Sequence, residues 1–142
     1  MNHPLCINSE ELEPYHTLSG TYTSKLLTGG SLNGEEIINI NEGTLKGGGT
    51  TPGDVHDKIE IYYILRCGNG AEVVLEQAGN STRYSVRPGD CILIPPGTRH
   101  WIDNTKCSDD IVILTLWQSQ ESNITYHNRM KEWGTSQRRI RH

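Results

Sequence analysis

Short stretches rich in apolar and β-branched residues alternate with turn-forming residues through the middle of the chain. The stretches expected to be strands are 21–27, 36–41, 59–66, 71–77, 83–87, 91–94 and 111–117. Two further short strands are expected to begin at residue 44 and just after residue 97. Turn signals recur about every ten residues, which is typical of a β-sandwich or β-barrel. No helical periodicity of useful length appears before residue 120. The pattern therefore predicts an all-β fold of antiparallel strands.

The two ends of the chain differ from this middle part. Residues 1–20 are polar and irregular, with a short helical turn expected at 10–14, and they read as an N-terminal arm. The tail, 119–142, is basic: from Arg129 onward it holds five Lys or Arg residues and one acidic residue. A short helix at 126–133 and a solvated, disordered end are both open interpretations. We expect one domain over 1–142, with its core at about 21–118.

Composition narrows the function classes. Among the 142 residues 34% are hydrophobic, 15 are Gly and none is Phe, which fits many short strands and tight turns. The net charge of −4 argues against a nucleic-acid-binding surface, and no apolar stretch is long enough to span a membrane. The N-terminus lacks the features of a signal peptide, and the four Cys residues are scattered. We therefore expect a cytoplasmic protein with reduced thiols and no nucleic-acid or membrane partner.

A candidate site begins in the stretch 89–104. The run 91–94 suits a strand, and Pro95-Pro96-Gly97 forces a turn after it, since proline cannot continue a β-ladder. His100 follows just past this turn. The turn is expected to hold this imidazole in a stiff frame, as a metal or catalytic site requires.

A second group of candidate residues lies upstream of this stretch. Asp54, His56 and Glu60 have the same parity, so they face the same side if the segment is extended throughout. His100 would then be the fourth member of the group. Two imidazoles and two carboxylates are ligands for a divalent cation.

The stretch around His100 is similar to the second motif of the cupin family. That motif reads G, five residues, P, one, G, two, H, three, N. It matches Gly89, Pro95, Gly97, His100 and Asn104 without a gap.

The upstream stretch resembles the first motif of the same family, with an alteration at a ligand position. Gly48, His56 and Glu60 match, Asp54 stands where the family has its first His, and the closing Gly comes one residue late, at Gly68. The resemblance implies a jelly roll of two antiparallel sheets with a metal site inside, and it implies a homodimer.

The ligand set limits the metal without naming it. Imidazole nitrogen suits Zn, Fe and Ni, and carboxylate oxygen brings in Mn and Fe(II), so one divalent ion of Zn, Mn, Fe or Ni is expected. Each ligand also has a structural interpretation: His100 can bond a backbone carbonyl, and Asp54 can cap the turn after Pro52-Gly53.

The expected function is enzymatic. Strand parity places Tyr62 on the face of Glu60, so these two residues are the candidates for proton transfer to and from a small polar substrate. Chemistry of the isomerase, epimerase or lyase type on a sugar or a hydroxy or keto acid is the first hypothesis. The alternatives are an Fe(II)-dependent dioxygenase and a cupin that binds a small molecule or a metal without catalysis.

Overall fold

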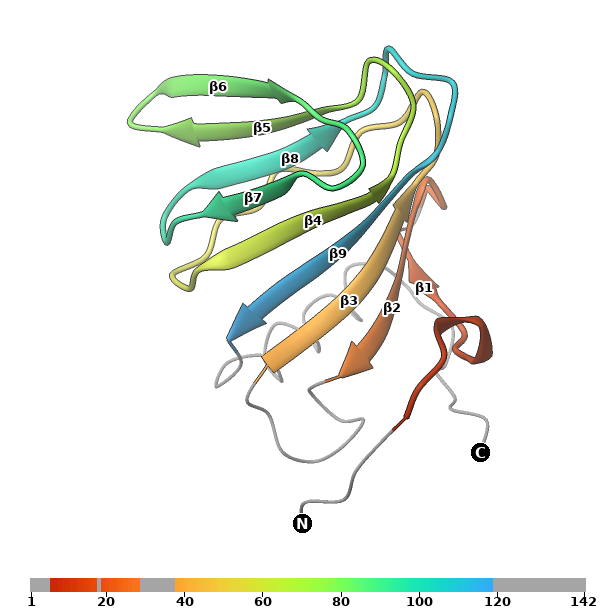
Figure 1. Cartoon of the computed structure of the whole chain (residues 1–142). Coiled ribbons are helices and arrows are strands. Elements are labelled where there is room, and N and C mark those ends of the chain that lie inside the picture. The colour runs from red at the N-terminus through yellow and green to blue at the C-terminus, as the bar shows by residue number, and fades with distance from the viewer. Residues whose placement is uncertain (1–5, 18, 29–37, 119–142) are drawn as a thin grey trace.

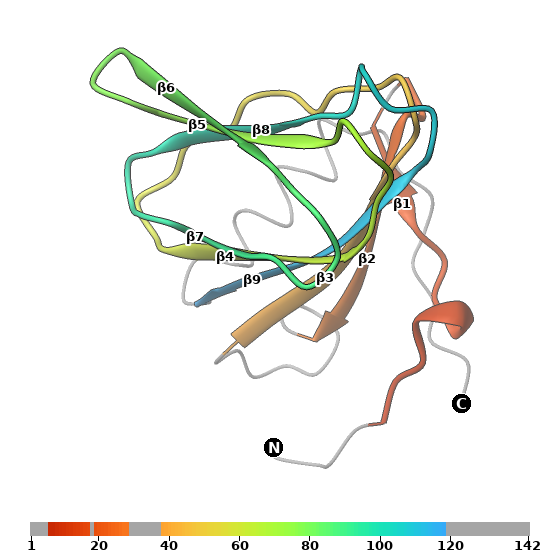
Figure 2. The ribbon, with the colours of Figure 1, turned by 45° about the horizontal axis from the view of Figure 1, so that its top comes forward.

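Two antiparallel β-sheets make up nearly all of the structure, a computed structural model that describes residues 6–17, 19–28 and 38–118. The described residues form nine strands and a single-turn 3-10 helix, Ser9–Glu11. Figures 1 and 2 show the two sheets facing each other across a common interior, without closing into a continuous barrel. This confirms the predicted all-β jelly roll. None of the described elements is a helix with the length and apolar character needed to cross a bilayer.

The larger sheet has six strands in the order β1-β2-β3-β9-β4-β7. Their bounds are β1 Tyr15–His16, β2 Tyr22–Thr28, β3 Ile38–Leu45, β9 Ile111–Gln118, β4 Glu60–Arg66 and β7 Cys91–Ile94. β9 lies between β3 and β4, so the last described strand occupies the middle of the sheet and links its two halves.

The smaller sheet has three strands in the order β6-β5-β8, with bounds Asn80–Ser85, Glu72–Gln77 and Arg99–Asp103. Because β4 pairs with strands of the large sheet and β5 with strands of the small one, Gly68-Asn69-Gly70 carries the chain from one sheet to the other. Two strands joined by a short Gly-Asn-Gly segment are expected to form a hairpin, and this interpretation of the sequence is wrong, because β4 and β5 do not pair with each other. Glycines permit a sharp change of direction whether or not the flanking strands pair.

The β5–β6 hairpin turns earlier than the sequence predicted. Gln77 pairs with Asn80, and the two residues between them, Ala78 and Gly79, have φ angles of 49° and 80°. Positive φ at both positions is typical of a tight type I′ hairpin turn. The strand expected at 83–87 therefore begins at Asn80, because this turn places the polar residues from Asn80 onward directly opposite β5.

The N-terminal arm is partly ordered by the sheet. Tyr15–His16 pairs with β2, and the Tyr15 ring is fully buried. The helical turn expected at 10–14 appears one residue earlier, at Ser9–Glu11, where the side chain of Asn8 accepts a hydrogen bond from the Glu10 amide at 2.9 Å. The predicted tail and its helix at 126–133 lie outside the described residues.

Side chains in the interior divide into an apolar end and a polar end. The hydrophobic core lies at one end of the strands and includes Leu45, Ile64, Val73, Ile102, Ile111 and Ile113. Toward the other end, the inward positions of β2, β3, β9 and β4 carry polar groups: Ser24, Asn39, Asn41, Thr115 and Glu60. The core stabilises the sheets, and the polar end is where chemistry can occur.

The glycine run 47–49 serves the packing of two loops. A side chain at Gly47 would collide with the backbone of Ser108, and Gly48 has a φ of 82° and donates its amide to the carbonyls of Asn104 and Cys107. The side-chain amide of Asn104 in turn donates from Nδ2 to the carbonyls of Asp109, at 2.8 Å, and Lys46, at 3.3 Å. Gly48 is the first residue of one cupin motif and Asn104 is the last residue of the other. The hydrogen bond between them therefore links the two motifs.

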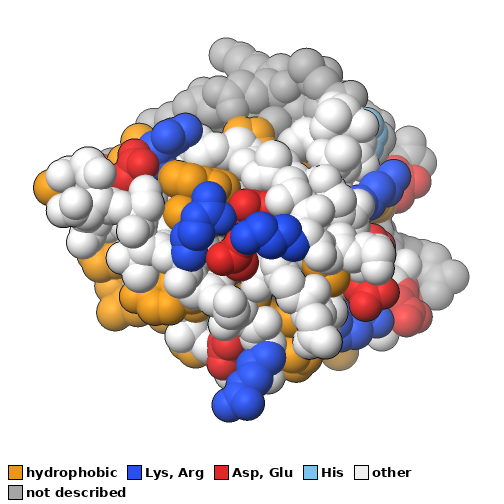
Figure 3. Space-filling view, turned by 90° about the horizontal axis from the view of Figure 1, so that it is seen from above, with side chains coloured by type: hydrophobic (Ala, Val, Ile, Leu, Met, Phe, Trp, Pro, Cys, Tyr) orange, Lys and Arg blue, Asp and Glu red, His pale blue; other side chains and the backbone are white. Residues whose placement is uncertain are grey.

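The outer face of the small sheet is covered by charges of both signs. Figure 3 shows Lys and Arg side chains beside Asp and Glu side chains on this face. Arg83 lies 3.0 Å from Asp103 and 3.4 Å from Glu72, and Lys106 lies 3.4 Å from the same Glu72. Exposed pairs of this kind keep the face hydrated and add little to stability.

Replacing Ile64 by Ala should destabilise the protein by about 2–5 kcal/mol, because the deletion leaves a cavity in a fully buried position of β4. Urea unfolding followed by circular dichroism measures the change. Leu93→Ala is the matched control, since Leu93 is 56% exposed on the neighbouring strand and should change stability by less than about 0.5 kcal/mol. Equal losses in both variants would contradict the assigned core.

Candidate metal centre

Backbone hydrogen bonds hold the two motif segments together. Asp54 forms an isolated antiparallel bridge with His100: the Asp54 amide donates to the His100 carbonyl at 3.0 Å, and the His100 amide donates back at 2.9 Å. The Gly97 amide donates to the carbonyl of His56 at 2.8 Å. Gly97 has a φ of 77° in the Pro95-Pro96-Gly97 turn, a conformation that glycine adopts without strain. The predicted stiff turn therefore fixes His100 and also positions His56.

Two imidazoles converge on one carboxylate oxygen. The Nε2 atoms of His56 and His100 each lie 3.0 Å from Oε1 of Glu60, and the two ring centroids are 5.0 Å apart. Glu60 and His100 are each only 1% exposed, whereas His56 is partly exposed. Residues that are 40 positions apart in the chain, 60 and 100, thus meet in the interior, as the sequence predicted.

The hydrogen bonds of the Nδ1 atoms of His56 and His100 determine that the Nε2 atoms are the ones available to a metal. Nδ1 of His56 lies 2.8 Å from the Lys58 carbonyl, and Nδ1 of His100 lies 2.9 Å from the Thr98 carbonyl. A carbonyl oxygen only accepts hydrogen bonds, so both Nδ1 atoms carry the proton. In the neutral rings, each Nε2 then presents a lone pair toward Glu60. Such backbone partners orient the ligand histidines of metal sites.

This donor set fits a divalent cation. Two nitrogen lone pairs facing a carboxylate oxygen repel one another unless a positive charge lies among them, either a proton or a metal ion. Imidazole nitrogens with carboxylate oxygens suit Zn, Fe, Ni and Mn. The residues present therefore match a metal centre in their chemistry and in their orientation.

Asp54 extends the same group. The ligand atoms of Asp54, His56 and His100 all lie within 4.8 Å of one another, so these three residues form a group that can hold a metal ion. Asp54 is exposed, and its Oδ1 also accepts a hydrogen bond from the Val55 amide at 2.9 Å. The structure thus groups Asp54 with His56 and His100, and it places Glu60 against the same two imidazoles. Whether Asp54 binds a metal or caps the turn stays a prediction.

Tyr62 lies next to this group on β4. Its ring and the ring of His100 meet edge to face, with centroids 5.8 Å apart, and the side chain is buried. The side chain faces the interior on the same side of β4 as Glu60, as strand parity predicted. Its role in proton transfer stays a prediction.

The environment of His56 favours its protonated form. The hydrogen bond with Glu60 raises the pKa of His56 above its ordinary value of 6.5, and the negative charges of Glu60 and Asp54 act in the same direction. Partial burial opposes them, because desolvation lowers the pKa. A metal ion binding at Nε2 therefore competes with a proton that is held more tightly than on a free imidazole.

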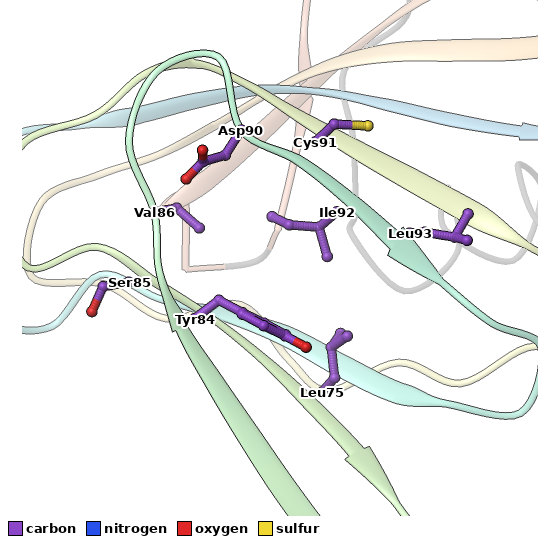
Figure 4. A pocket seen from close by; sticks show the side chains of 8 residues that line it. All are labelled: Leu75, Tyr84, Ser85, Val86, Asp90, Cys91, Ile92 and Leu93. Atoms are coloured by element: carbon purple, nitrogen blue, oxygen red, sulfur yellow. The ribbon is translucent and has the colours of Figure 1, made fainter.

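A cavity of about 370 Å³, lined by both apolar and polar side chains, lies between the edge strands β6 and β7 (Figure 4). Two of its lining residues are cross-strand partners of residues in the site: Leu75 pairs with His100, and Ile92 pairs with Tyr62. Tyr84 contributes an aromatic ring. None of the four predicted metal ligands lines this cavity.

Sequence reasoning missed the polar residues at the inner end of β3. Asn39 and Asn41 alternate with Ile38 and Ile40, and the natural interpretation points the isoleucines inward. In the structure, both asparagines are buried and Ile38 is exposed. The alternation was a visible signal, but its direction depends on the pairing of β3 with β9.

The comparisons with known proteins agree with this architecture. Residues 41–117 match the family described as the cupin domain. The chain belongs to the cupin family. The match covers more than half of the chain and includes the four candidate metal ligands, and it confirms the resemblance seen in the two motifs. No curated protein is similar enough in sequence to match this cupin.

Solved structures share the cupin fold at low sequence identity. A predicted oxalate decarboxylase from Thermotoga maritima has a TM-score of 0.64 and 22% identity, over 80% of this chain and 98% of that one. The polyketide cyclase RemF from Streptomyces resistomycificus has a TM-score of 0.66 and 18% identity, over 93% and 97%. A protein from Photorhabdus luminescens has a TM-score of 0.61 and 17% identity, over 92% and 99%. These likenesses establish the fold alone.

The metal-free protein should lose stability as the pH rises from 6.5 through the raised pKa of His56. A proton that is held more tightly in the folded state stabilises that state fully below the unfolded pKa, and this contribution disappears once the folded His56 deprotonates. Thermal unfolding midpoints measured in chelator over a pH series test this.

The matched control is His56→Gln, which removes the titrating group and should flatten this part of the profile. Parallel profiles for the wild type and the variant would show that His56 does not carry the effect. Added divalent metal should reverse the wild-type trend, because proton competition for Nε2 falls as the pH rises.

Proposed function

We propose that this cupin is a metal-dependent enzyme that transfers a proton on a small polar metabolite, in chemistry of the isomerase, epimerase or lyase type. The observation that carries the proposal is the convergence of two imidazole Nε2 atoms on the buried carboxylate of Glu60. Both rings are held by backbone carbonyls in the tautomer that leaves Nε2 free for a metal.

The metal would be held by His56 and His100, with carboxylate oxygens from Glu60 and Asp54. When bound, a divalent ion supplies Lewis-acid polarisation of a carbonyl or hydroxyl oxygen. The residues of the chain orient this group: the Tyr62 ring packs edge to face against His100, and Leu75 and Ile92 are the cross-strand neighbours of His100 and Tyr62.

Proton transfer is assigned to Glu60 and Tyr62. The Glu60 carboxylate lies 3.0 Å from Nε2 of His56 and of His100. A carboxylate beside the metal ligands suits the role of base. Tyr62 holds a phenolic proton two residues further along the same face of β4 and suits the role of donor. A small-molecule substrate would enter between these groups.

The fold does not choose among reactions. The structures similar to this cupin include proteins named as a predicted oxalate decarboxylase and a polyketide cyclase. A second candidate function has support from the donor set itself: His56, His100 and Glu60 form a two-His, one-carboxylate group, which is the ligand set of non-haem Fe(II) oxygenases. A homodimer and a cytoplasmic location also stay proposals for this chain.

Metal analysis of protein purified without chelator should find about one divalent ion per chain, and His100→Ala should weaken metal binding by at least about 100-fold. His100 is buried, and no other described imidazole can replace its nitrogen beside His56. His16→Ala is the matched control, because His16 lies on β1 and bonds the Thr17 carbonyl, outside the centre. Full metal content in His100→Ala would refute the centre.

Two further variants assign the carboxylates. Asp54→Ala should lower metal affinity less than His100→Ala, since Asp54 is exposed; an unchanged affinity would make Asp54 a turn residue only. Glu60→Gln separates ligand from base. Metal retained with activity lost indicates a base, whereas metal lost indicates a ligand.

Tyr62→Phe should slow proton transfer by about 10²–10⁴-fold while leaving metal content and unfolding unchanged. The measurement is exchange of substrate C–H protons for deuterium, followed by NMR under anaerobic conditions with Zn, Mn or Ni. The substrates to test are 2-hydroxy acids, 2-keto acids and aldoses. Turnover only with Fe(II) and oxygen uptake would instead favour the dioxygenase, and binding without any turnover would favour a non-catalytic cupin.

A further inference from the structure

A row of buried polar groups crosses the inner face of the large sheet beside the metal centre. Asn41 on β3 pairs with Thr115 on β9, and Thr115 pairs with Tyr62 on β4. One step closer to the end of the sheet, Asn39 lies opposite Trp117, which lies opposite Glu60. Directly paired residues in antiparallel strands place their side chains about 5 Å apart on the same face, so this row leads directly to the metal centre.

Several polar atoms in this row have no hydrogen-bond partner in the part of the chain that the structure describes. They are Nδ2 of Asn39, Nδ2 of Asn41 and Oγ1 of Thr115, with Oγ of Ser24 on the neighbouring strand β2. The four side chains are between 1% and 4% exposed. Leaving a buried donor without a partner costs about 1–3 kcal/mol, so a row of such groups needs a reason other than stability.

The orientation of Asn41 is fixed from behind. The hydroxyl of the buried Tyr15 donates to Oδ1 of Asn41 at 3.2 Å. Oδ1 is therefore held as an acceptor, and Nδ2 is left as the free end of the amide. Asn41 thus presents N–H donors, and a ligand that meets it must offer acceptors.

The charge of the interior limits such a ligand. Among residues 6–17, 19–28 and 38–118, every Lys and Arg side chain is at least partly exposed, so none of them faces the row from the interior. A phosphate dianion held by Asn39, Asn41 and Thr115 would meet neutral amides and a hydroxyl without a Lys or Arg side chain, which is unfavourable. Hydroxyl, carbonyl and single carboxylate groups need only the neutral hydrogen bonds that the row supplies.

We propose that Asn39, Asn41 and Thr115 bind the oxygen atoms of the substrate, and that this substrate is a neutral or singly charged, unphosphorylated molecule such as a hydroxy acid, a keto acid or a sugar. The inference rests on the proposed function, because the row ends at the metal centre. The unpartnered polar atoms are thus preorganised for a ligand.

The first experiment separates binding from structure. Thr115→Val and Asn39→Leu remove unpartnered polar atoms with little change in shape, so the unfolding temperature of each variant should equal or exceed that of the wild type. Thr44→Val is the matched control, since Thr44 lies on the outer face of β3. A clear fall in unfolding temperature for Thr115→Val and Asn39→Leu, but not for Thr44→Val, would make the row structural and overturn the proposal.

The second experiment measures binding by calorimetry with glycolate, pyruvate and D-xylose, and with 2-phosphoglycolate and phosphoenolpyruvate as phosphorylated counterparts. At least one unphosphorylated probe should bind the protein as purified, more tightly than the phosphorylated probes do. Thr115→Val and Asn39→Leu should weaken that binding about tenfold, whereas Thr44→Val should not. Failure of every unphosphorylated probe, preference for a phosphorylated one, or unchanged binding in both variants would overturn the proposal.

Metal content measured on the same samples distinguishes the two proposals. Probe binding that depends on Thr115 and Asn39 in a protein without metal would support the row and reject the metal-dependent enzyme. Probe binding that does not depend on Thr115 or Asn39 in a metal-loaded protein would reject the proposed role of the row and leave the metal-dependent enzyme in place.

Discussion

The buried carboxylate of Glu60 is the constraint on which the functional end of this cupin depends. An ionised carboxylate that is 1% exposed is stable only beside a compensating positive charge. Two imidazoles lie 3.0 Å away, with their Nδ1 protons committed to backbone carbonyls. The site must therefore hold either a proton or a cation among these three groups, and competition between the two couples metal binding to pH.

The rigidity around this carboxylate comes from loops rather than from long strands. The Pro95-Pro96-Gly97 turn sets His100 and donates to the carbonyl of His56, and the bridge between Asp54 and His100 joins the two motif segments. At the far end of the same segments, Gly48 and Asn104 tie the loops together. The positions of the candidate ligands therefore depend on backbone hydrogen bonds together with the side-chain amide of Asn104.

The interior of the sandwich is divided between stability and chemistry along the same strands. β4 carries Ile64 in the core, then Tyr62, then Glu60 at the metal centre, and β9 carries Ile113 in the core and Thr115 beside the site. Beyond the core, Thr115 on β9 and Asn39 and Asn41 on β3 carry buried polar atoms without a partner among the described residues, and these atoms lower stability. Functional sites often carry such a cost, since a preorganised binding surface is unsatisfied until its ligand arrives.

The sequence alone determined the all-β class, the turn before His100, and the shared face of Glu60 and Tyr62, because each follows from local rules: strand alternation, the ring of proline and the freedom of glycine. It also indicated the metal ligands through two spaced motifs.

Only the tertiary structure decided what depends on pairing between distant segments. Asp54 and His56 reach the centre from an irregular segment, held by bonds to β8 and to the turn before it rather than by one continuous strand. Gly68-Asn69-Gly70 crosses between sheets instead of closing a hairpin. Asn39 and Asn41 face inward because β3 pairs with β9 in that register, and a shift of one residue would reverse every side chain.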